Sequence, residues 1–98
     1  MKFYVVTFNR KLGASYTKFH EEFVADPKVN RWFHYTRSSY LIGTELTARE
    51  LSDHFRLVAV KYGLPQRHLV IRVDLRDRHG FLPKGAWDWI QKQLKTMD

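Results

Sequence analysis

The feature that most constrains the fold is the order in which strand-like and helix-like segments follow one another along the 98 residues. Hydrophobic periodicity and turn residues give the order strand, helix, strand, strand, helix, strand, helix. The first six segments match the split βαβ arrangement, in which right-handed crossovers place both helices on one face of a four-stranded antiparallel sheet. The sequence therefore predicts an α+β fold with an extra C-terminal helix, forming a single domain over residues 1–98.

The first half of the chain supplies three of the strands and the first helix. Lys2–Phe8 is aromatic and β-branched and is apolar on both faces, which predicts a central strand covered on both sides. A helix follows the Gly13 break, with Ser15 as its candidate cap and Pro27 as its limit. Two short aromatic runs within Arg31–Thr44 then predict a hairpin.

The second half carries the clearest local signal, a capping box formed by Thr47 and Glu50. It predicts a helix that ends at Gly63, because glycine suits the left-handed C-terminal cap. His68–Asp74 alternates like a strand, and Lys84–Lys95 has the apolar spacing of a short amphipathic helix. In the strand we expect three side chains to point inward: Leu69, Ile71 and Val73.

The sheet face opposite the two main helices needs a cover. Both faces of Lys2–Phe8 are too apolar for bare exposure to water, so we expect the C-terminal helix to cover part of the far face. A second copy of the chain would cover the rest, which predicts a homodimer joined through the sheet face or the sheet edge. The alternative is a monomer in which Trp87 and Trp89 close the surface alone.

Composition limits the classes of function. The 17 Lys and Arg against ten Asp and Glu give a net charge of +7, which favours polyanionic partners if the charges cluster. The absence of cysteine excludes disulfides, cysteine-bound zinc and a thiol nucleophile. The N-terminal apolar run is too short for a signal peptide or a membrane span. We therefore expect a cytoplasmic chain with no membrane partner and no cofactor.

Catalytic motifs find little support. The segment Ser39–Gly43 lacks the pattern of basic, glycine and aromatic residues that RNA-recognition motifs need on their third strand. His34-Tyr35-Thr36 is a single His-x-Thr unit, whereas two-histidine phosphoesterases need two. The remaining histidines have no metal-binding spacing, so the sequence predicts scattered imidazoles: His20, His54, His68 and His79.

Basic side chains follow the first and the last predicted strands. Asp74 and Asp77 stand among the second group, where salt bridges would neutralise them and leave a metal-binding role as the less favoured interpretation. Because the two strands run antiparallel as neighbours, the two groups are expected at opposite ends of one chain, and a dimer would bring them together. The two groups are Arg10 and Lys11 on one side, and Arg76 and Arg78 on the other.

Four stretches of the chain resemble the SinR-like small bacterial proteins, which are relatives of the CRISPR-associated protein two family. The stretches are Phe3–Phe8, Trp32–Tyr35, Ser38–Ile42 and Phe81–Ile90. The resemblance implies a ferredoxin-like fold, a homodimer and kinship with proteins that bind nucleic acid, some of which are metal-dependent nucleases.

In those nucleases an aspartate from each subunit ends the first strand, and the two carboxylates hold a divalent cation. Asn9 stands at the equivalent position here. A neutral amide is a poor ligand where hard cations want carboxylates, so this departure argues against nuclease activity and against a bound metal.

Three hypotheses follow. The leading one is a noncatalytic homodimer that binds DNA or RNA through basic side chains, with Asn9, Arg10, Lys11, Arg76 and Arg78 as the candidate contact residues. The second is a metal-dependent nuclease that uses Asp74 or Asp77. The third is a protein-interaction module of a bacterial or phage defence system or an antitoxin-like system.

Overall fold

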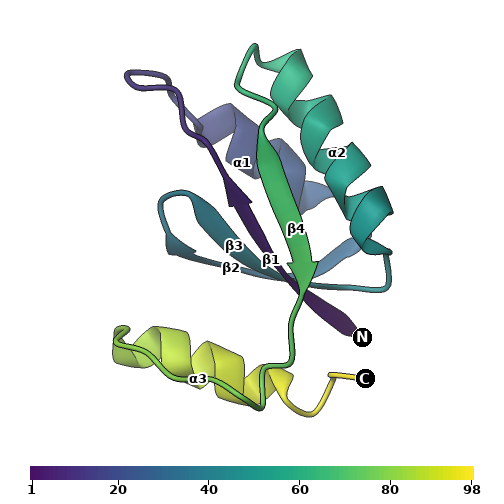
Figure 1. Ribbon diagram of the computed structural model, residues 1–98, viewed down its shortest axis with the longest axis vertical. Helices are drawn as coiled ribbons and strands as arrows, with labels where there is room; N and C mark the ends of the chain where they lie inside the picture. Colours follow the sequence, from purple (N-terminus) through teal and green to yellow (C-terminus); the bar gives the residue numbers. More distant parts are fainter.

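The computed structural model describes all residues, 1–98, and contains four strands and three helices (Figure 1). The helices are α1, α2 and α3, with bounds Thr17–Ala25, Ala48–Lys61 and Lys84–Gln93. The strands are β1, β2, β3 and β4, with bounds Lys2–Phe8, Val29–Thr36, Ser39–Thr44 and His68–Arg72. The chain order is the predicted one.

The four strands form one antiparallel sheet in the spatial order β2-β3-β1-β4. This order, with α1 and α2 packed on the same face, is the ferredoxin-like arrangement, and α3 is the additional C-terminal helix. The prediction of an α+β ferredoxin-like sheet with a C-terminal helix is therefore confirmed. Strands β2 and β4 lie at the two edges of the sheet.

The main core lies between the sheet and the pair α1 and α2. Even-numbered side chains of β1 point into it, and Phe8 packs against the rings of Phe19 and Phe55 at centroid distances of 6.3 and 5.3 Å. The capping box of α2 forms as predicted, since Glu50 N donates to Thr47 Oγ1 and Thr47 N donates to Glu50 Oε1. Gly63 follows α2 with φ of +64°.

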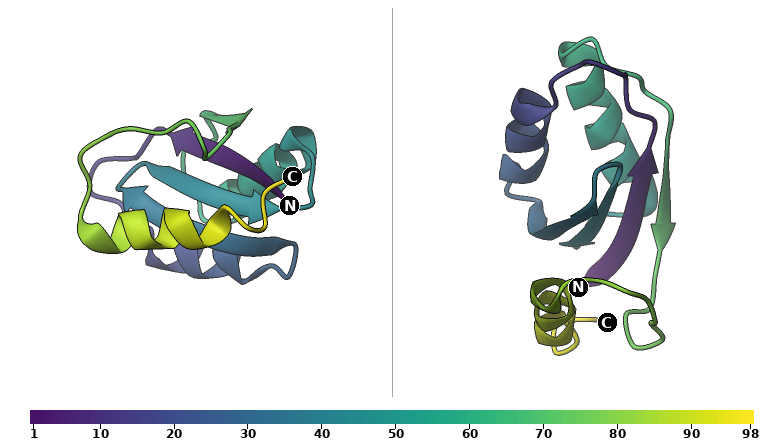
Figure 2. Two further views of the ribbon diagram at one scale, coloured as in Figure 1. Left: turned by 90° about the horizontal axis from the view of Figure 1, so that it is seen from below. Right: turned by 90° about the vertical axis from the view of Figure 1, so that its left-hand side faces the viewer.

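A second, smaller core lies on the far face of the sheet, beneath α3 (Figure 2). Phe3 is its centre, and Trp89 of α3 meets Phe3 and Phe33 at centroid distances of 6.3 and 5.5 Å. Gly43 in β3 makes room for it, because a Cβ there would come within 2.6 Å of the Phe3 ring. The C-terminal helix thus covers part of the far face, as expected.

The interpretation of the fourth strand was wrong in two respects. The strand ends at Arg72 rather than Asp74, and Leu69 and Ile71 are 53% and 52% exposed instead of buried. Val70 packs toward the main core, because α2 lies on that side of β4. Leu69 and Ile71 lie on the α3 side, and α3 does not extend over β4.

Smaller differences concern the helix ends. Tyr16 rather than Ser15 holds the N-cap position of α1 and makes no side-chain cap hydrogen bond, although the Ser15 hydroxyl accepts a long hydrogen bond of 3.4 Å from the backbone N–H of Thr17. Helix α3 ends at Gln93, two residues before the predicted Lys95. None of the three helices has the length and apolar character that crossing a bilayer requires.

Candidate nucleic-acid interface

The five candidate contact residues fall into two groups at opposite ends of β1. Asn9, Arg10 and Lys11 follow Phe8, at what we call the Phe8 end. Arg76 and Arg78 lie between β4 and α3, beyond the other end of β1, which we call the Lys2 end. The structure therefore does not bring the two groups together within one chain, as the antiparallel order predicted.

The arginines of the Lys2 end are held by partners of the same chain. Arg76 makes two hydrogen bonds to the Asp74 carboxylate, at 3.0 and 2.9 Å, and these lower the pKa of Asp74 to about 2. Arg78 donates to the carbonyl oxygen of Leu75 at 3.1 Å and to Oε1 of Gln91 at 2.9 Å. Both side chains thereby fix the segment that leads into α3.

The same contacts bear on the metal-dependent hypothesis. The Asp74 carboxylate already accepts hydrogen bonds from Arg76, and an arginine cannot give up its charge to make way for a cation. No three histidine, aspartate or glutamate side chains are arranged so that they would hold a metal ion. At the end of β1, Asn9 pairs through its backbone, since its N–H donates to the carbonyl oxygen of Arg67 at 3.1 Å.

At the Phe8 end the cations meet no carboxylate. Arg10 donates to the carbonyl oxygen of Arg37 at 2.6 Å, and its guanidinium lies 4.1 Å from the centroid of the Tyr16 ring. The hydroxyl of Tyr16 accepts a hydrogen bond of 2.8 Å from the backbone N–H of Lys11. No acidic side chain lies within salt-bridge distance of Arg10, Lys11 or Arg37.

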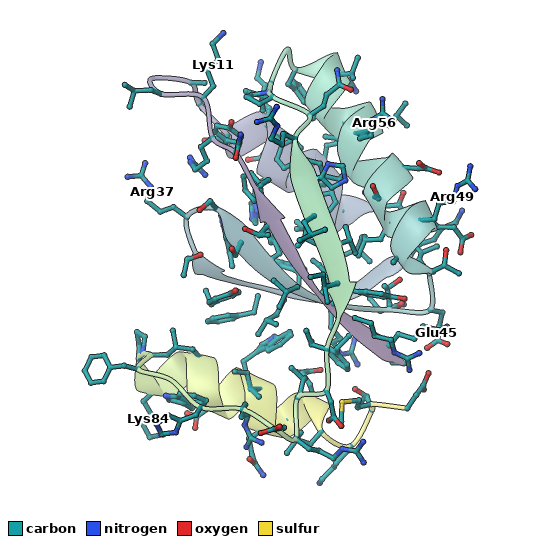
Figure 3. All side chains as sticks on the ribbon, viewed as in Figure 1. Lys11, Arg37, Glu45, Arg49, Arg56 and Lys84 are labelled. Carbon is teal, nitrogen blue, oxygen red and sulfur yellow. The ribbon has the colours of Figure 1, made fainter.

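These three cations line one hollow of the surface. Residues 10–14 and Arg37 form its walls, so the loop after β1 faces the turn between β2 and β3. The side chains of Lys11 and Arg37 both project outward on this side of the molecule (Figure 3). The sequence prediction included Arg10 and Lys11 but not Arg37, whose place beside them depends on the hairpin folding back along β1.

Next to this hollow lies a cluster of rings that the sequence interpretation missed. His20 of α1 shares a hydrogen bond of 2.8 Å with the hydroxyl of Tyr40 in β3. The ring of His34 in β2 stacks on Tyr40 at a centroid distance of 4.3 Å and lies 5.7 Å from the ring of His20. His20, one of the four histidines predicted to be scattered, therefore lies beside His34, a neighbour that the sequence interpretation did not foresee.

The pKa values of this cluster follow from burial and positive charge. Burial lowers the pKa of the His34 imidazole, and the charges of His20 and Arg10 lower it further, against a hydrogen bond to the carbonyl oxygen of Arg37. Burial also raises the pKa of the Tyr40 phenol. The lowered pKa of His34 and the raised pKa of Tyr40 both favour the neutral form of the side chain at neutral pH.

The signal that would have found the cluster is the alternation along β2. Residues two apart on a strand share a face, so Trp32 and His34 had to lie on the same side. What the sequence does not contain is the position of α1, which brings His20 against both of them at ring centroid distances of 4.8 and 5.7 Å.

Comparison of the chain with protein-family models, with curated proteins and with solved structures gives no significant match. The geometry of the Phe8 end is therefore the basis of the function proposed below.

Proposed function

We propose that this chain binds nucleic acid without catalysing a reaction, through the basic side chains of the Phe8 end, and that it does so as a homodimer. The observation that carries the proposal is the convergence of Arg10, Lys11 and Arg37 on one hollow with no carboxylate to neutralise them. Backbone phosphates are the ligands that such unpaired cations favour. The net charge of +7 supports the same assignment.

The fold supports the proposed kinship with the SinR-like proteins and the CRISPR-associated protein two family, as far as architecture goes. A ferredoxin-like sheet with an added C-terminal helix agrees with what that resemblance implies. Asn9 at the end of β1 and the engaged Asp74 favour binding over metal-dependent cleavage.

The homodimer is supported by the uncovered part of the far sheet face. Leu69 and Ile71 stand half exposed on the edge strand β4, whose outer hydrogen-bonding edge pairs with no other strand. An exposed apolar edge strand invites pairing with another chain. If two β4 strands pair antiparallel about a two-fold axis, the Phe8 end of one copy comes beside the Lys2 end of its partner. The dimer would then place the two basic groups side by side, with the Phe8 end supplying the cations that no carboxylate neutralises and the Lys2 end adding only its long-range positive charge.

Binding is tested by electrophoretic shift with DNA and RNA at low salt, where phosphate contacts are strongest. We expect a shift that weakens steeply as salt is added. Failure to shift either polymer at low salt would end the proposal and leave the protein-interaction module, which co-purification with a protein partner would then favour.

The dimer is tested by sedimentation of the wild-type chain and of Ile71→Asp. We expect the wild type to sediment as a dimer and Ile71→Asp as a monomer, because a carboxylate in a buried apolar contact is costly. Leu57→Asp, at an exposed position of α2, is the matched control and should remain a dimer. Single chains at high wild-type concentration would contradict the dimer.

A further inference from the structure

Trp32 is an aromatic side chain that the fold leaves partly open, at the level of Tyr4 in β1 and two residues before His34. It lies on the edge strand β2, and 40% of it is exposed. The His20 ring meets it at nearly a right angle, at a centroid distance of 4.8 Å, so the indole is held in place while part of it stays open to solvent. A large indole fixed in this way offers a flat surface for stacking.

Trp32 belongs to a row that runs along β2 toward the basic hollow. His34 follows two residues later on the same face, about 6.7 Å further along the strand, and its ring bonds the carbonyl oxygen of Arg37 at 3.1 Å. Arg10 donates to that same carbonyl oxygen. The row therefore runs from the Trp32 indole through the His34 imidazole to the Arg37 carbonyl oxygen, to which the Arg10 guanidinium is bound. Its basic end is the hollow of the Phe8 end.

This order of side chains along β2 suits a single-stranded nucleic acid better than a duplex. In a duplex the base faces are stacked on one another and cannot reach a side-chain ring, whereas the bases of a single strand are free to stack on aromatic side chains. Cations beside such a platform bind the phosphates that connect the bases. A duplex would use the cations alone and leave Trp32 without a role.

We propose that the row formed by Trp32, His34 and Arg37 is a binding site for single-stranded nucleic acid, in which the indole stacks on a base and Arg37 and Arg10 bind the adjacent phosphates. The inference rests on the proposed function and narrows its polymer from nucleic acid in general to single strands. Single-stranded RNA and single-stranded DNA both offer bases for stacking and phosphates for the arginines, so both are tested.

The experiment measures binding of fluorescently labelled oligouridylate, oligothymidylate and a duplex of equal length at one salt concentration. Wild type should bind at least one of the single strands about tenfold more tightly than the duplex, since stacking of one base contributes on the order of 1–3 kcal/mol. Trp32→Thr, which keeps β-propensity, should lose about tenfold for single strands and nothing for the duplex. Phe81→Thr, at another exposed aromatic position, should change neither.

A second readout does not depend on a variant's folding. Single strands should quench the tryptophan fluorescence of the wild-type protein, and inorganic polyphosphate, a polyanion without bases, should not. Equal affinity for single strands and duplex, or equal quenching by polyphosphate, would overturn the single-strand site while leaving the proposed function intact. Absence of binding to every nucleic acid tested would overturn both.

Discussion

The two ends of the sheet are both basic, yet their cations are in different states. At the Lys2 end, Arg76 is held by Asp74, and Arg72 lies 4.0 Å from the Asp98 carboxylate. At the Phe8 end, Arg10 donates to the carbonyl oxygen of Arg37 and lies over the Tyr16 ring, and neither arginine has a carboxylate within salt-bridge distance. The comparison teaches that a surplus of positive charge alone does not single out a candidate binding surface, and that the partners each cation already has must be considered as well.

The physical reason is that a phosphate must compete with the partner that each cation already has. A phosphate that approaches Arg76 must displace a carboxylate that already makes two hydrogen bonds to the guanidinium, so it gains little. A phosphate that approaches Lys11 or Arg37 displaces only water. The following predictions test this difference, from the largest expected effect to the smallest.

The first prediction concerns the rings on which the Phe8 end is built. Phe8→Ala should lower the free energy of unfolding by about 3–5 kcal/mol, because truncating a buried phenylalanine leaves a cavity. Phe8 contacts four other rings, those of Tyr16, Phe19, Tyr40 and Phe55. Urea denaturation measures the loss, and Leu57→Ala on the exposed face of α2 is a control that should change little. A loss of less than about 1 kcal/mol for Phe8→Ala would contradict this packing.

The second prediction compares two triple variants of equal net charge. Replacing Arg10, Lys11 and Arg37 by alanine should weaken binding of nucleic acid by at least about a hundredfold, because each charged hydrogen bond contributes on the order of 1.5–3 kcal/mol and three are removed. Replacing Arg49, Arg76 and Arg78 by alanine removes the same charge elsewhere and should weaken binding only a few-fold. Fluorescence anisotropy measures both. Equal losses in the two variants would mean that the comparison between the ends is wrong.

The third prediction concerns the paired state of the Lys2 end. The pKa of Asp74 is lowered to about 2 by Arg76, so this carboxylate contributes stability that is present above its unfolded value and is lost as the pH falls through about 4 toward 2. Asp74→Asn should therefore flatten the acid limb of stability measured by urea denaturation. It should also free Arg76 and raise the affinity for nucleic acid slightly. An unchanged acid limb would count against the pairing.

The fourth and smallest effect concerns His34. Its pKa lies below the ordinary value, chiefly because the ring is partly buried, so protonation favours the unfolded chain. Stability should decrease as the pH falls below about 6.5 and toward the lowered pKa of the folded state. Thermal denaturation followed by circular dichroism measures this loss of stability, which should be absent in His34→Gln. A rise of wild-type stability in the same pH range would contradict the assigned direction.

The fold was predictable where the signal was local. The capping box of Thr47 and Glu50 and the left-handed Gly63 depend on a few neighbouring residues, and both form as predicted. The inward orientation of Leu69 and Ile71 was wrong because alternation along a strand separates two faces without saying which one a helix covers. Helix α2 lies over Val70, and that position is a property of the whole fold.

In the candidate site, too, some features followed from the sequence and others depended on the whole fold. Topology placed Arg10 and Arg76 at opposite ends of the sheet, since antiparallel neighbours leave no other choice. The neighbours that give the Phe8 end its character came from elsewhere in the chain. Arg37 lies in the hairpin turn, three residues after His34, whereas His20 lies on α1 and meets His34 only because that helix packs against the sheet.

The most direct test of the central claim maps the contact surface residue by residue. Nuclear magnetic resonance of the labelled protein, titrated with a short single strand at low salt, records which backbone amides change. The account predicts that the changes fall in the loop at residues 9–15 of the Phe8 end and in the segment 32–38, which runs along β2 to that end. Changes confined to residues 74–80 at the Lys2 end, with the Phe8 end unaffected, would contradict it.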